Sequence, residues 1–218
     1  MDHLWDAATP FDEQTSLSFE RIVFFSDAVM AIVITLLVID LRIPDIPPEL
    51  ASTELPIHLG ELTPRIVSFV ISFTVVGIYW ASHHRYFTYI KRYDRRLVFL
   101  NLVFLFFITL MPFVASLLGQ YGYLAIGVVV YGLAVAATGF SIGSIWWYAS
   151  YQHRLVDQGL DEAFIRIRNR VALVAPMVFL LSLPFALLSP LITMALWWIA
   201  PFAAMLVLRV MERRVYRG

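Results

Sequence analysis

Six apolar stretches, each about as long as a bilayer is thick, constrain this chain more than any other feature. A spanning helix needs roughly 20 mainly apolar residues. The stretches fall near Leu17–Ile43, Pro64–Phe87, Leu97–Leu118, Tyr123–Tyr148, Val171–Leu188 and Leu191–Arg209. Of the 218 residues, 60% are hydrophobic and 15% charged, a composition typical of membrane proteins. We therefore predict an all-α membrane protein with six transmembrane helices and no room for a soluble catalytic domain.

Basic residues gather in the connections on one side of the predicted membrane domain. They are Arg21, Lys91, Arg92, Arg95, Arg96, Arg154, Arg166, Arg168, Arg170, Arg209, Arg213, Arg214 and Arg217. Only Arg42 and Arg65 fall on the other side. Because loops rich in Lys and Arg stay in the cytoplasm, we expect a multi-pass protein of the cell (inner) membrane with both termini cytoplasmic.

The predicted domain organisation follows from these spans. Residues 1–17 form a cytoplasmic tail, residues 18–211 the six-span domain, and residues 212–218 a basic cytoplasmic tail. The acidic opening has no long apolar run and is not expected to be a cleaved signal peptide. The segment after the first span, residues 44–64, is rich in Pro and acidic residues, which indicates an outer loop.

The composition also limits the chemistry that we expect. The chain has no cysteine, which excludes disulfides and thiol catalysis. His83 and His84 are adjacent, so on a helix they point about 100° apart and cannot share one metal ion. We expect no enzymatic activity, no catalytic residues, no bound metal or cofactor, no nucleic-acid partner and no small-molecule substrate.

The first span has two different faces. Projected at about 100° per residue, Ile32, Leu36 and Ile39 form one apolar stripe, and Thr35 lies beside it. Asp27 lies roughly 140° around the helix from Ile32, and Ser26 is also off the stripe. We therefore expect Ser26 and Asp27 to face the helix bundle and the apolar stripe to face elsewhere.

Asp27 needs a partner, because an ionised carboxylate within a span is costly unless it is paired. Candidates at the same depth are His83 and His84 near the end of the second span, and Asn101 near the start of the third. We predict that Ser26 and Asp27 bond to His83 or His84 and to Asn101. Such a network would fix the helix geometry; a proton relay is the alternative reading.

The stretch RIVFFSDAVMAIVITLLVIDL resembles the first helix of the transmembrane protein 175 family of potassium channels. The motif is an Arg followed, after three residues, by Phe-Ser-Asp, here Arg21, Phe25, Ser26 and Asp27. The AIVITLL run that follows, YWASHHRYF in the second span and Asn101 at the start of the third also fit. The likeness extends over the six-span layout.

The resemblance implies that the first helix lines a pore. It assigns Ile32 to the narrowest hydrophobic constriction, Leu36 and Ile39 to apolar layers further out, and Thr35 to a role in selectivity. This chain has one copy of the motif, so a pore lined by equivalent helices requires several subunits, and the family precedent is a homotetramer. Arg21, Ser26 and Asp27 would anchor the pore helix to the second and third spans.

A hydrophobic constriction is the mechanism that the resemblance implies. No TVGYG-type loop is present, so a filter of backbone carbonyls is excluded. A ring of Ile32 side chains would block flow when dewetted and, when wider, would favour potassium, which loses its water more cheaply than sodium. Asp40 and Asp45, with Glu49 and Glu54, would concentrate cations at the outer mouth.

Other functions stay open at this point. A proton-coupled or cation secondary transporter would use Asp27 with His83 or His84, although no inverted repeat or acid at mid-membrane supports it. A non-conducting membrane scaffold is a further possibility. A hydrolytic triad is disfavoured because adjacent Ser26 and Asp27 point about 100° apart on a helix.

Overall fold

The computed structural model describes the backbone of residues 13–216 and the side chains of residues 19–211. It consists of helices, and the only strand-like pairing among the described residues is a single antiparallel bridge between Ile90 and Val156. The predicted tails at residues 1–17 and 212–218 lie largely outside this description. Residues 13–17, which were assigned to the first tail, already belong to the first helix.

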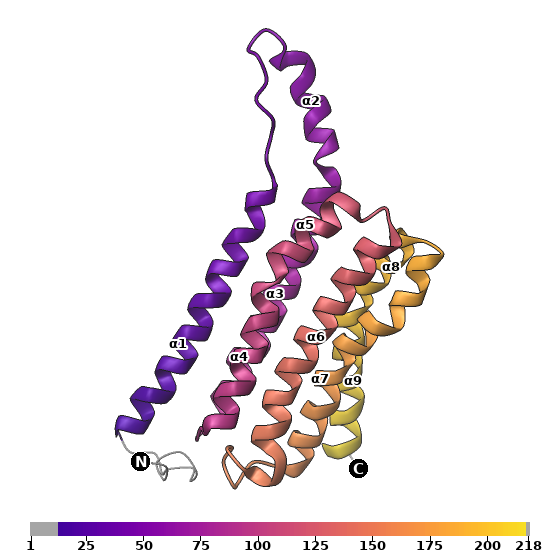
Figure 1. The fold of residues 1–218 in the computed structure, drawn as a ribbon. Coiled ribbons are helices and arrows are strands. Elements are labelled where there is room, and N and C mark those ends of the chain that lie inside the picture. The colour runs from indigo at the N-terminus through magenta and orange to yellow at the C-terminus, as the bar shows by residue number, and fades with distance from the viewer. Residues whose placement is uncertain (1–12, 217–218) are drawn as a thin grey trace.

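The helices follow one another along a long, narrow bundle (Figure 1). They are α1 (Glu13–Leu36), η1 (Leu37–Asp40), α2 (Ala51–Glu61), α3 (Thr63–Tyr89), α4 (Arg95–Thr109), α5 (Met111–Tyr121), α6 (Ala125–Ser150), η2 (Tyr151–His153), α7 (Glu162–Ser182), η3 (Leu183–Leu187), α8 (Pro190–Trp197) and α9 (Ile199–Tyr216).

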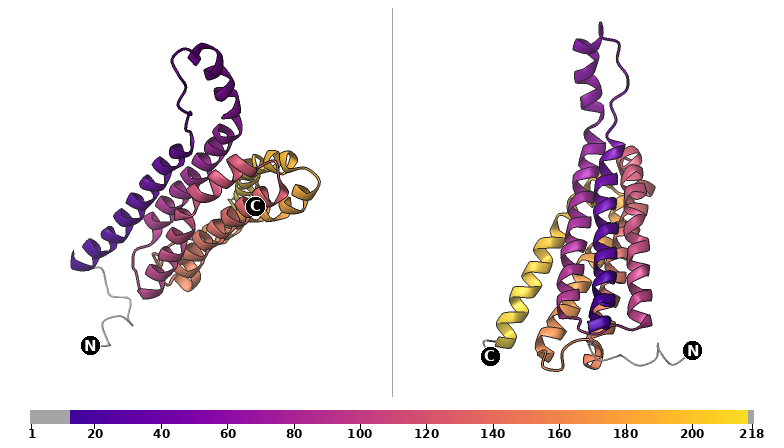
Figure 2. Two further views of the ribbon diagram at one scale, coloured as in Figure 1. Left: turned by 45° about the horizontal axis from the view of Figure 1, so that its top comes forward. Right: turned by 90° about the vertical axis from the view of Figure 1, so that its left-hand side faces the viewer.

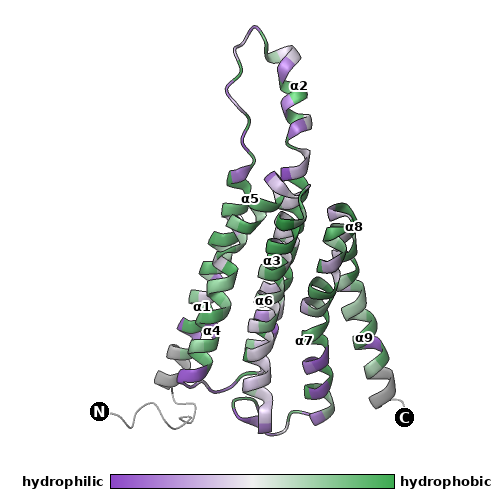
Figure 3. Cartoon of the chain, turned by 45° about the vertical axis from the view of Figure 1, so that its right-hand side comes forward, coloured by the Kyte–Doolittle hydropathy of each residue, from purple (hydrophilic) through white to green (hydrophobic). Residues whose placement is uncertain are grey.

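Six helical stretches in the described chain are long and apolar enough to cross a membrane, which confirms the predicted six-span fold. They are Phe19–Asp40, Thr63–Tyr89, Arg95–Tyr121, Ala125–His153, Glu162–Leu187 and Pro190–Met211. The start of α1 and the end of α9 lie at the same end of the bundle, as an even number of spans requires (Figure 1). Hydrophilic residues gather at the two ends and in the projection beyond α3 (Figure 3).

Prolines and caps place several helix ends. Asp94 caps α4 by accepting a hydrogen bond from the Leu97 backbone N–H at 2.8 Å, and Asp161 caps α7 in the same way through Ala163 at 2.8 Å. Pro112 stands in the first turn of α5, directly after a break at Leu110 that divides the third span. A proline is tolerated in a first turn because its missing N–H would have no partner there.

The centre of the bundle is α6, which packs against α3, α4, α5, α7 and α8. One face of α6 carries the small residues Gly132, Ala136 and Gly139. A Cβ atom on Gly139 would lie 3.0 Å from Pro176 of α7 and 2.9 Å from the Tyr79 hydroxyl of α3, so glycine is what allows these helices to approach. By contrast, α9 packs against α7 and α8 and diverges from the rest of the bundle (Figure 2).

The segment between the first two spans is not the irregular loop that its prolines and acids indicated. It rises from α1 as an extended chain, turns at residues 48–50, and returns as α2, which stands clear of the bundle (Figure 1). Apart from Leu62, α2 runs directly into α3, and the hydrogen bonds from Leu62 N to His58 O and from Ile66 N to Leu62 O bridge the junction. Pro56 does not break α2 in the structure.

Candidate functional site

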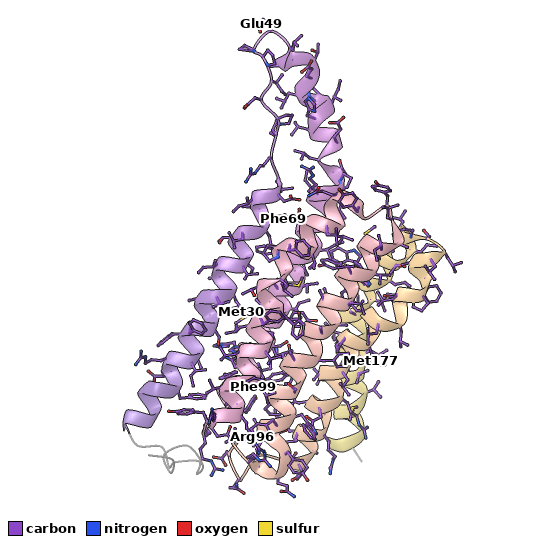
Figure 4. The ribbon with its side chains drawn as sticks, viewed as in Figure 1. Met30, Glu49, Phe69, Arg96, Phe99 and Met177 are labelled. Carbon is purple, nitrogen blue, oxygen red and sulfur yellow. The ribbon has the colours of Figure 1, made fainter. Side chains whose placement is uncertain are left out.

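The first helix lies at one edge of the bundle and uses only one of its sides within the subunit. Met30, Val33 and Leu37 are buried against the rest of the chain, at the spacing of successive helical turns. This side of α1 packs against α3, α4 and α5. Figure 4 labels Met30 where α1 meets its neighbour α4. On another side of α1, the side chains of Phe25, Ile32 and Leu36 are exposed.

A buried polar chain links α1, α4 and α3, as expected. The Asn101 Nδ2 donates to Ser26 Oγ at 2.8 Å, and Ser26 Oγ donates in turn to the Ile22 carbonyl at 2.9 Å. His83 Nε2 lies 2.9 Å from Asn101 Oδ1. Since an amide oxygen only accepts, His83 carries its proton on Nε2 and donates it. Ser26, His83 and Asn101 are almost fully buried.

The rings around His83 hold it in place. Phe87 stacks on it with ring centroids 4.2 Å apart, and Phe104 stacks with its centroid at 5.5 Å. The remaining nitrogen, Nδ1, is buried and has no hydrogen-bond partner. This packing leaves the imidazole with one satisfied hydrogen bond and little freedom to rotate, which favours a role in holding the three helices together.

The predicted partner of Asp27 is wrong. Its carboxylate accepts a hydrogen bond from the indole N–H of Trp80 at 3.0 Å and reaches none of His83, His84 and Asn101. His84 is exposed and stacks on the Trp80 ring, with ring centroids 6.0 Å apart. Trp80 precedes His84 by one helical turn, so the tryptophan could have been found as a donor on the same face of α3.

Two other motif residues do not join this network. Arg21 is exposed and forms no hydrogen bond or ion pair with another described residue, so its expected anchoring contact is not found in the described part of the chain. Phe25 is also exposed, at 54% of its surface. The anchoring of α1 is therefore carried by Ser26 and Asp27.

The predicted apolar stripe lies on the uncovered side of α1. Ile32 is 59% exposed, Leu36 41% and Ile39 48%. Thr35 is exposed beside them, and its hydroxyl donates to the Ile32 carbonyl at 2.8 Å. The oxygen of that hydroxyl keeps lone pairs that point away from the backbone it is bonded to. A continuous ladder of apolar side chains with one hydroxyl thus faces outward over several turns.

A polar cluster sits at the outer end of the stripe. Ser116 donates to the Asp40 carboxylate at 2.9 Å, and Gln120 donates to Ser116 at 2.7 Å. A pocket of about 440 Å³ opens here. Its lining consists of Leu36, Ile39, Asp40, Arg42, Arg65, Pro112 and Ser116. Asp45 is exposed in the extended chain beyond it. The contacts of Ser116 and Gln120 were not predicted from any sequence pattern.

Among the residues that the structure describes, no group of three or more His, Asp or Glu side chains is arranged to hold a metal ion. The polar groups of the site instead form hydrogen bonds within α1 and to the neighbouring helices α3 and α4. What the arrangement provides is a fixed orientation for α1 and an exposed apolar ladder.

Comparison with known proteins identifies a family. Residues 21–112 match the family model described as the endosomal/lysosomal potassium channel TMEM175. This region contains α1 from Arg21 onward, the Asp27–Trp80 contact, and the Ser26–Asn101–His83 chain.

Individual relatives cover more of the chain. A potassium channel of Streptomyces collinus is 35% identical over 160 residues, which are 70% of this chain and 75% of the relative. A potassium channel of Chamaesiphon minutus is 28% identical over 172 residues, 78% of this chain and 84% of the relative. The endosomal/lysosomal proton channel TMEM175 of Rattus norvegicus is 30% identical over 159 residues, 73% of this chain but only 32% of the rat protein.

The fold matches a solved structure. The crystal structure of a lysosomal potassium-selective channel TMEM175 homolog from Chamaesiphon minutus superposes with a TM-score of 0.74 at 24% identity, covering 87% of this chain and 98% of that one. At this identity the similarity establishes the common arrangement of helices.

Proposed function

The chain belongs to the TMEM175 channel family, and from this membership we propose that it forms a potassium-preferring cation channel whose pore is lined by α1. Both bacterial relatives described above are named potassium channels. The six apolar helices make the chain a multi-pass membrane protein.

One observation carries the proposal: α1 and the adjoining η1 expose Ile32, Leu36 and Ile39, while the opposite side of α1 is fixed by buried hydrogen bonds. A hydrogen-bonded chain sets the rotation of a helix, because turning the helix would break the bonds and leave buried polar groups unpaired. The outward direction of the stripe is therefore built into the subunit. An apolar surface whose direction is set in this way, at the edge of a subunit, is suited to contact equivalent surfaces of other subunits around a shared symmetry axis.

The pore would form from four subunits. Cyclic symmetry brings equivalent α1 helices together around one axis, and the homotetramer is the arrangement that we propose. Four Ile32 side chains would make the narrowest hydrophobic ring, followed outward by Leu36 and Ile39. Such a ring stops flow by dewetting when it is narrow.

The preference for potassium would arise at this ring without a carbonyl filter. A permeating ion must shed part of its hydration shell there, and potassium does so at lower cost than sodium. Thr35 offers an oxygen beside the ring, and the acids Asp40 and Asp45 would raise the local concentration of cations at the outer mouth. Potassium is the permeant ion and not a resident cofactor. The Lys and Arg distribution supports an orientation with both termini in the cytoplasm.

Replacing Ile32 tests the proposal. In proteoliposomes, we expect Ile32→Asn to increase the potassium leak, since a polar ring wets more easily than an apolar one. Ile78→Asn is the matched control, because Ile78 is an exposed isoleucine on α3 away from the stripe. Equal fluxes for wild type, Ile32→Asn and Ile78→Asn would exclude a pore at this stripe and favour a scaffold.

The alternative transporter makes a different prediction. A carrier that uses Asp27 and His83 as a relay would show saturable, proton-coupled flux that Asp27→Asn abolishes. Asp27 is instead bonded to Trp80, and His83 to Asn101. Single-channel currents that persist in Asp27→Asn protein would rule out the relay.

A further inference from the structure

A pocket of about 110 Å³ lies between α3, α6, α7 and α9, and its lining is almost wholly apolar. Val75 of α3, Val135 of α6, Ala175 of α7 and Ala204 of α9 all contribute to it. Because α9 packs against α7 and α8 and diverges from the rest of the bundle (Figure 2), the pocket lies where α9 departs from α3. None of the described residues of α1 lines it, so the pocket is separate from the apolar stripe.

Three polar side chains in the lining already donate hydrogen bonds within the subunit. The Thr74 hydroxyl donates to a backbone carbonyl one helical turn earlier at 2.8 Å, and the Tyr79 hydroxyl donates to the Val135 carbonyl at 2.8 Å. The Trp197 indole N–H donates to Ser182 Oγ at 2.9 Å. A buried water needs about two to four polar partners, and these side chains offer it no free donor. The pocket is therefore suited to an apolar occupant.

The pocket lies at the middle of the membrane-spanning helices. Val75, Ala175 and Ala200 line it, and each lies within one residue of the midpoint of its span. The hydrocarbon core of a bilayer is about 30 Å thick, so this level is about 15 Å from either headgroup region. Lipid headgroups and water-soluble ligands stay outside this depth, whereas the ends of acyl chains reach it.

The pocket is open to the surface on one side. Among its lining side chains, Thr74 and Trp198 are exposed, Trp198 at 48%, whereas Val135 and Phe179 are only 0% and 4% exposed. An occupant can therefore enter from the lipid and contact side chains that lipid lying along the outside of the bundle does not reach. An apolar cavity of about 150 Å³ binds benzene, so this smaller pocket suits the last few carbon atoms of a chain.

We propose that this pocket binds the end of one phospholipid acyl chain from the surrounding bilayer. An acyl chain end is narrow, flexible and apolar, and it is what the bilayer supplies at this depth. If the pocket stayed empty, the atoms of its lining would lose dispersion contacts on one side, and the chain end restores them. The bound chain fills the space between α3 and α9 and so steadies α9, whose packing within the subunit is against α7 and α8.

Photo-cross-linking can detect an acyl chain end in the pocket. The protein is reconstituted in phosphatidylglycerol vesicles with a small fraction of a phospholipid that carries a diazirine at the end of one acyl chain, and the labelled residues are mapped by mass spectrometry after irradiation. We expect label on Phe179 and no label above background on Phe104, which is 0% exposed in the core. A diazirine placed beside the headgroup should label Phe179 about tenfold less, because its reactive group stays about 15 Å away. Equal labelling of Phe179 by the two probes, or label on Phe179 no higher than on Phe104, would overturn the proposal.

Filling the pocket provides a matched pair of variants. Ala204→Phe places a ring in the pocket and should lower the labelling of Phe179 about tenfold, since little volume remains for a chain end. Ala195→Phe makes the same change at an exposed alanine on α8, outside the lining, and should change the labelling by less than about twofold. Unchanged labelling in Ala204→Phe would exclude the pocket as the binding site. If that variant fails to fold, the smaller replacement Ala204→Leu should lower the labelling about threefold.

A free fatty acid is the other possible source of an acyl chain. Unlabelled oleic acid added at about one tenth of the phospholipid should lower the labelling of Phe179 by no more than about that fraction, because it competes by mass action as one chain among many. A loss of more than about half would assign the pocket to a free fatty acid and overturn the assignment to phospholipid. The labelling involves no ion flux, so its outcome is independent of the proposed channel function.

Discussion

The helices α1 and α9 are similarly uncovered within the subunit but differ in what holds them. In the most apolar part of each span, 22% of the residues are buried in Phe19–Asp40 and 17% in Pro190–Met211. On α9 the exposed side chains include Phe202 and Leu206, as apolar as Ile32 on α1. Yet α1 is tied to α3 and α4 by side-chain hydrogen bonds, whereas the described residues of α9 make none.

The difference shows that exposure alone does not distinguish a surface that faces lipid from one that faces another subunit. Apolar contacts such as those of α9 on α7 hold a helix against its neighbour but allow small rotations and shifts. A hydrogen bond is directional, so the Asn101–Ser26 bond permits only a narrow range of rotations of α1. The exposed side of α1 is therefore the one whose direction the subunit specifies.

Cross-linking should show the largest difference between α1 and α9. The chain contains no cysteine, so one introduced cysteine is the only thiol. We expect Ile32→Cys protein in membranes to form nearly complete intersubunit cross-links with a short bifunctional thiol reagent, because equivalent residues meet around the axis. Phe202→Cys, on α9, is the control and should remain monomeric on a denaturing gel. The reverse pattern would place α9 and not α1 at the symmetry axis.

The next largest effect concerns the bonds that fix α1. Asn101→Leu leaves Ser26 and His83 without their partner, and we expect the free energy of unfolding to fall by about 1–3 kcal/mol. The value can be measured by denaturation in mixed micelles. Leu206→Ala on α9 truncates an exposed side chain and should change the free energy by less than about 0.5 kcal/mol. Equal stability of Asn101→Leu and wild type would show that the network does not hold α1.

The smallest expected effect lies in the stripe itself. Thr35→Val removes the only hydroxyl beside Ile32 and should lower the potassium-to-sodium permeability ratio roughly two- to fivefold, the equivalent of one weak oxygen contact. The measurement is a reversal potential under mixed-ion conditions.

Thr109→Val is a close control for this change. Thr109 is exposed, and its hydroxyl donates to the Phe106 carbonyl at 2.8 Å, the same bond that Thr35 makes to Ile32. A loss of selectivity in both variants would point to a general effect of the substitution on helices and not to a pore at α1.

The sequence predicted the parts of the structure that depend on repeated local signals. Six spans follow from apolar length, and the two faces of α1 follow from helical periodicity, so both could be obtained without coordinates. The Ser26–Asn101 bond was within reach because few polar residues share that depth. The spans and the two faces of α1 are each encoded by many residues at once. The Ser26–Asn101 bond could be predicted because few other polar partners were available.

The features that the sequence did not reveal depend on single contacts. Trp80 entered the sequence analysis only as part of the YWASHHRYF motif, and partners for Asp27 were sought among His83, His84 and Asn101, so the Trp80 N–H was missed as the donor to Asp27. α2 was missed because Pro47, Pro48 and Pro56 outweighed its short helical pattern. The contact of Ser116 with Asp40 depends on how α5 meets η1, which no local pattern encodes.

The junction at Leu62 makes α2 and α3 nearly one rod. From Ala51 to Tyr89 the rod measures about 58 Å at 1.5 Å per residue, and it carries both the outer tip and the His83 contact on a single stiff element. An antibody fragment that binds the tip of α2 would therefore bind the same helical element that carries His83, whose hydrogen bond to Asn101 helps to hold α1. Because α2 projects beyond the bundle, a binder could reach it without entering the bilayer and could immobilise or displace the whole second span.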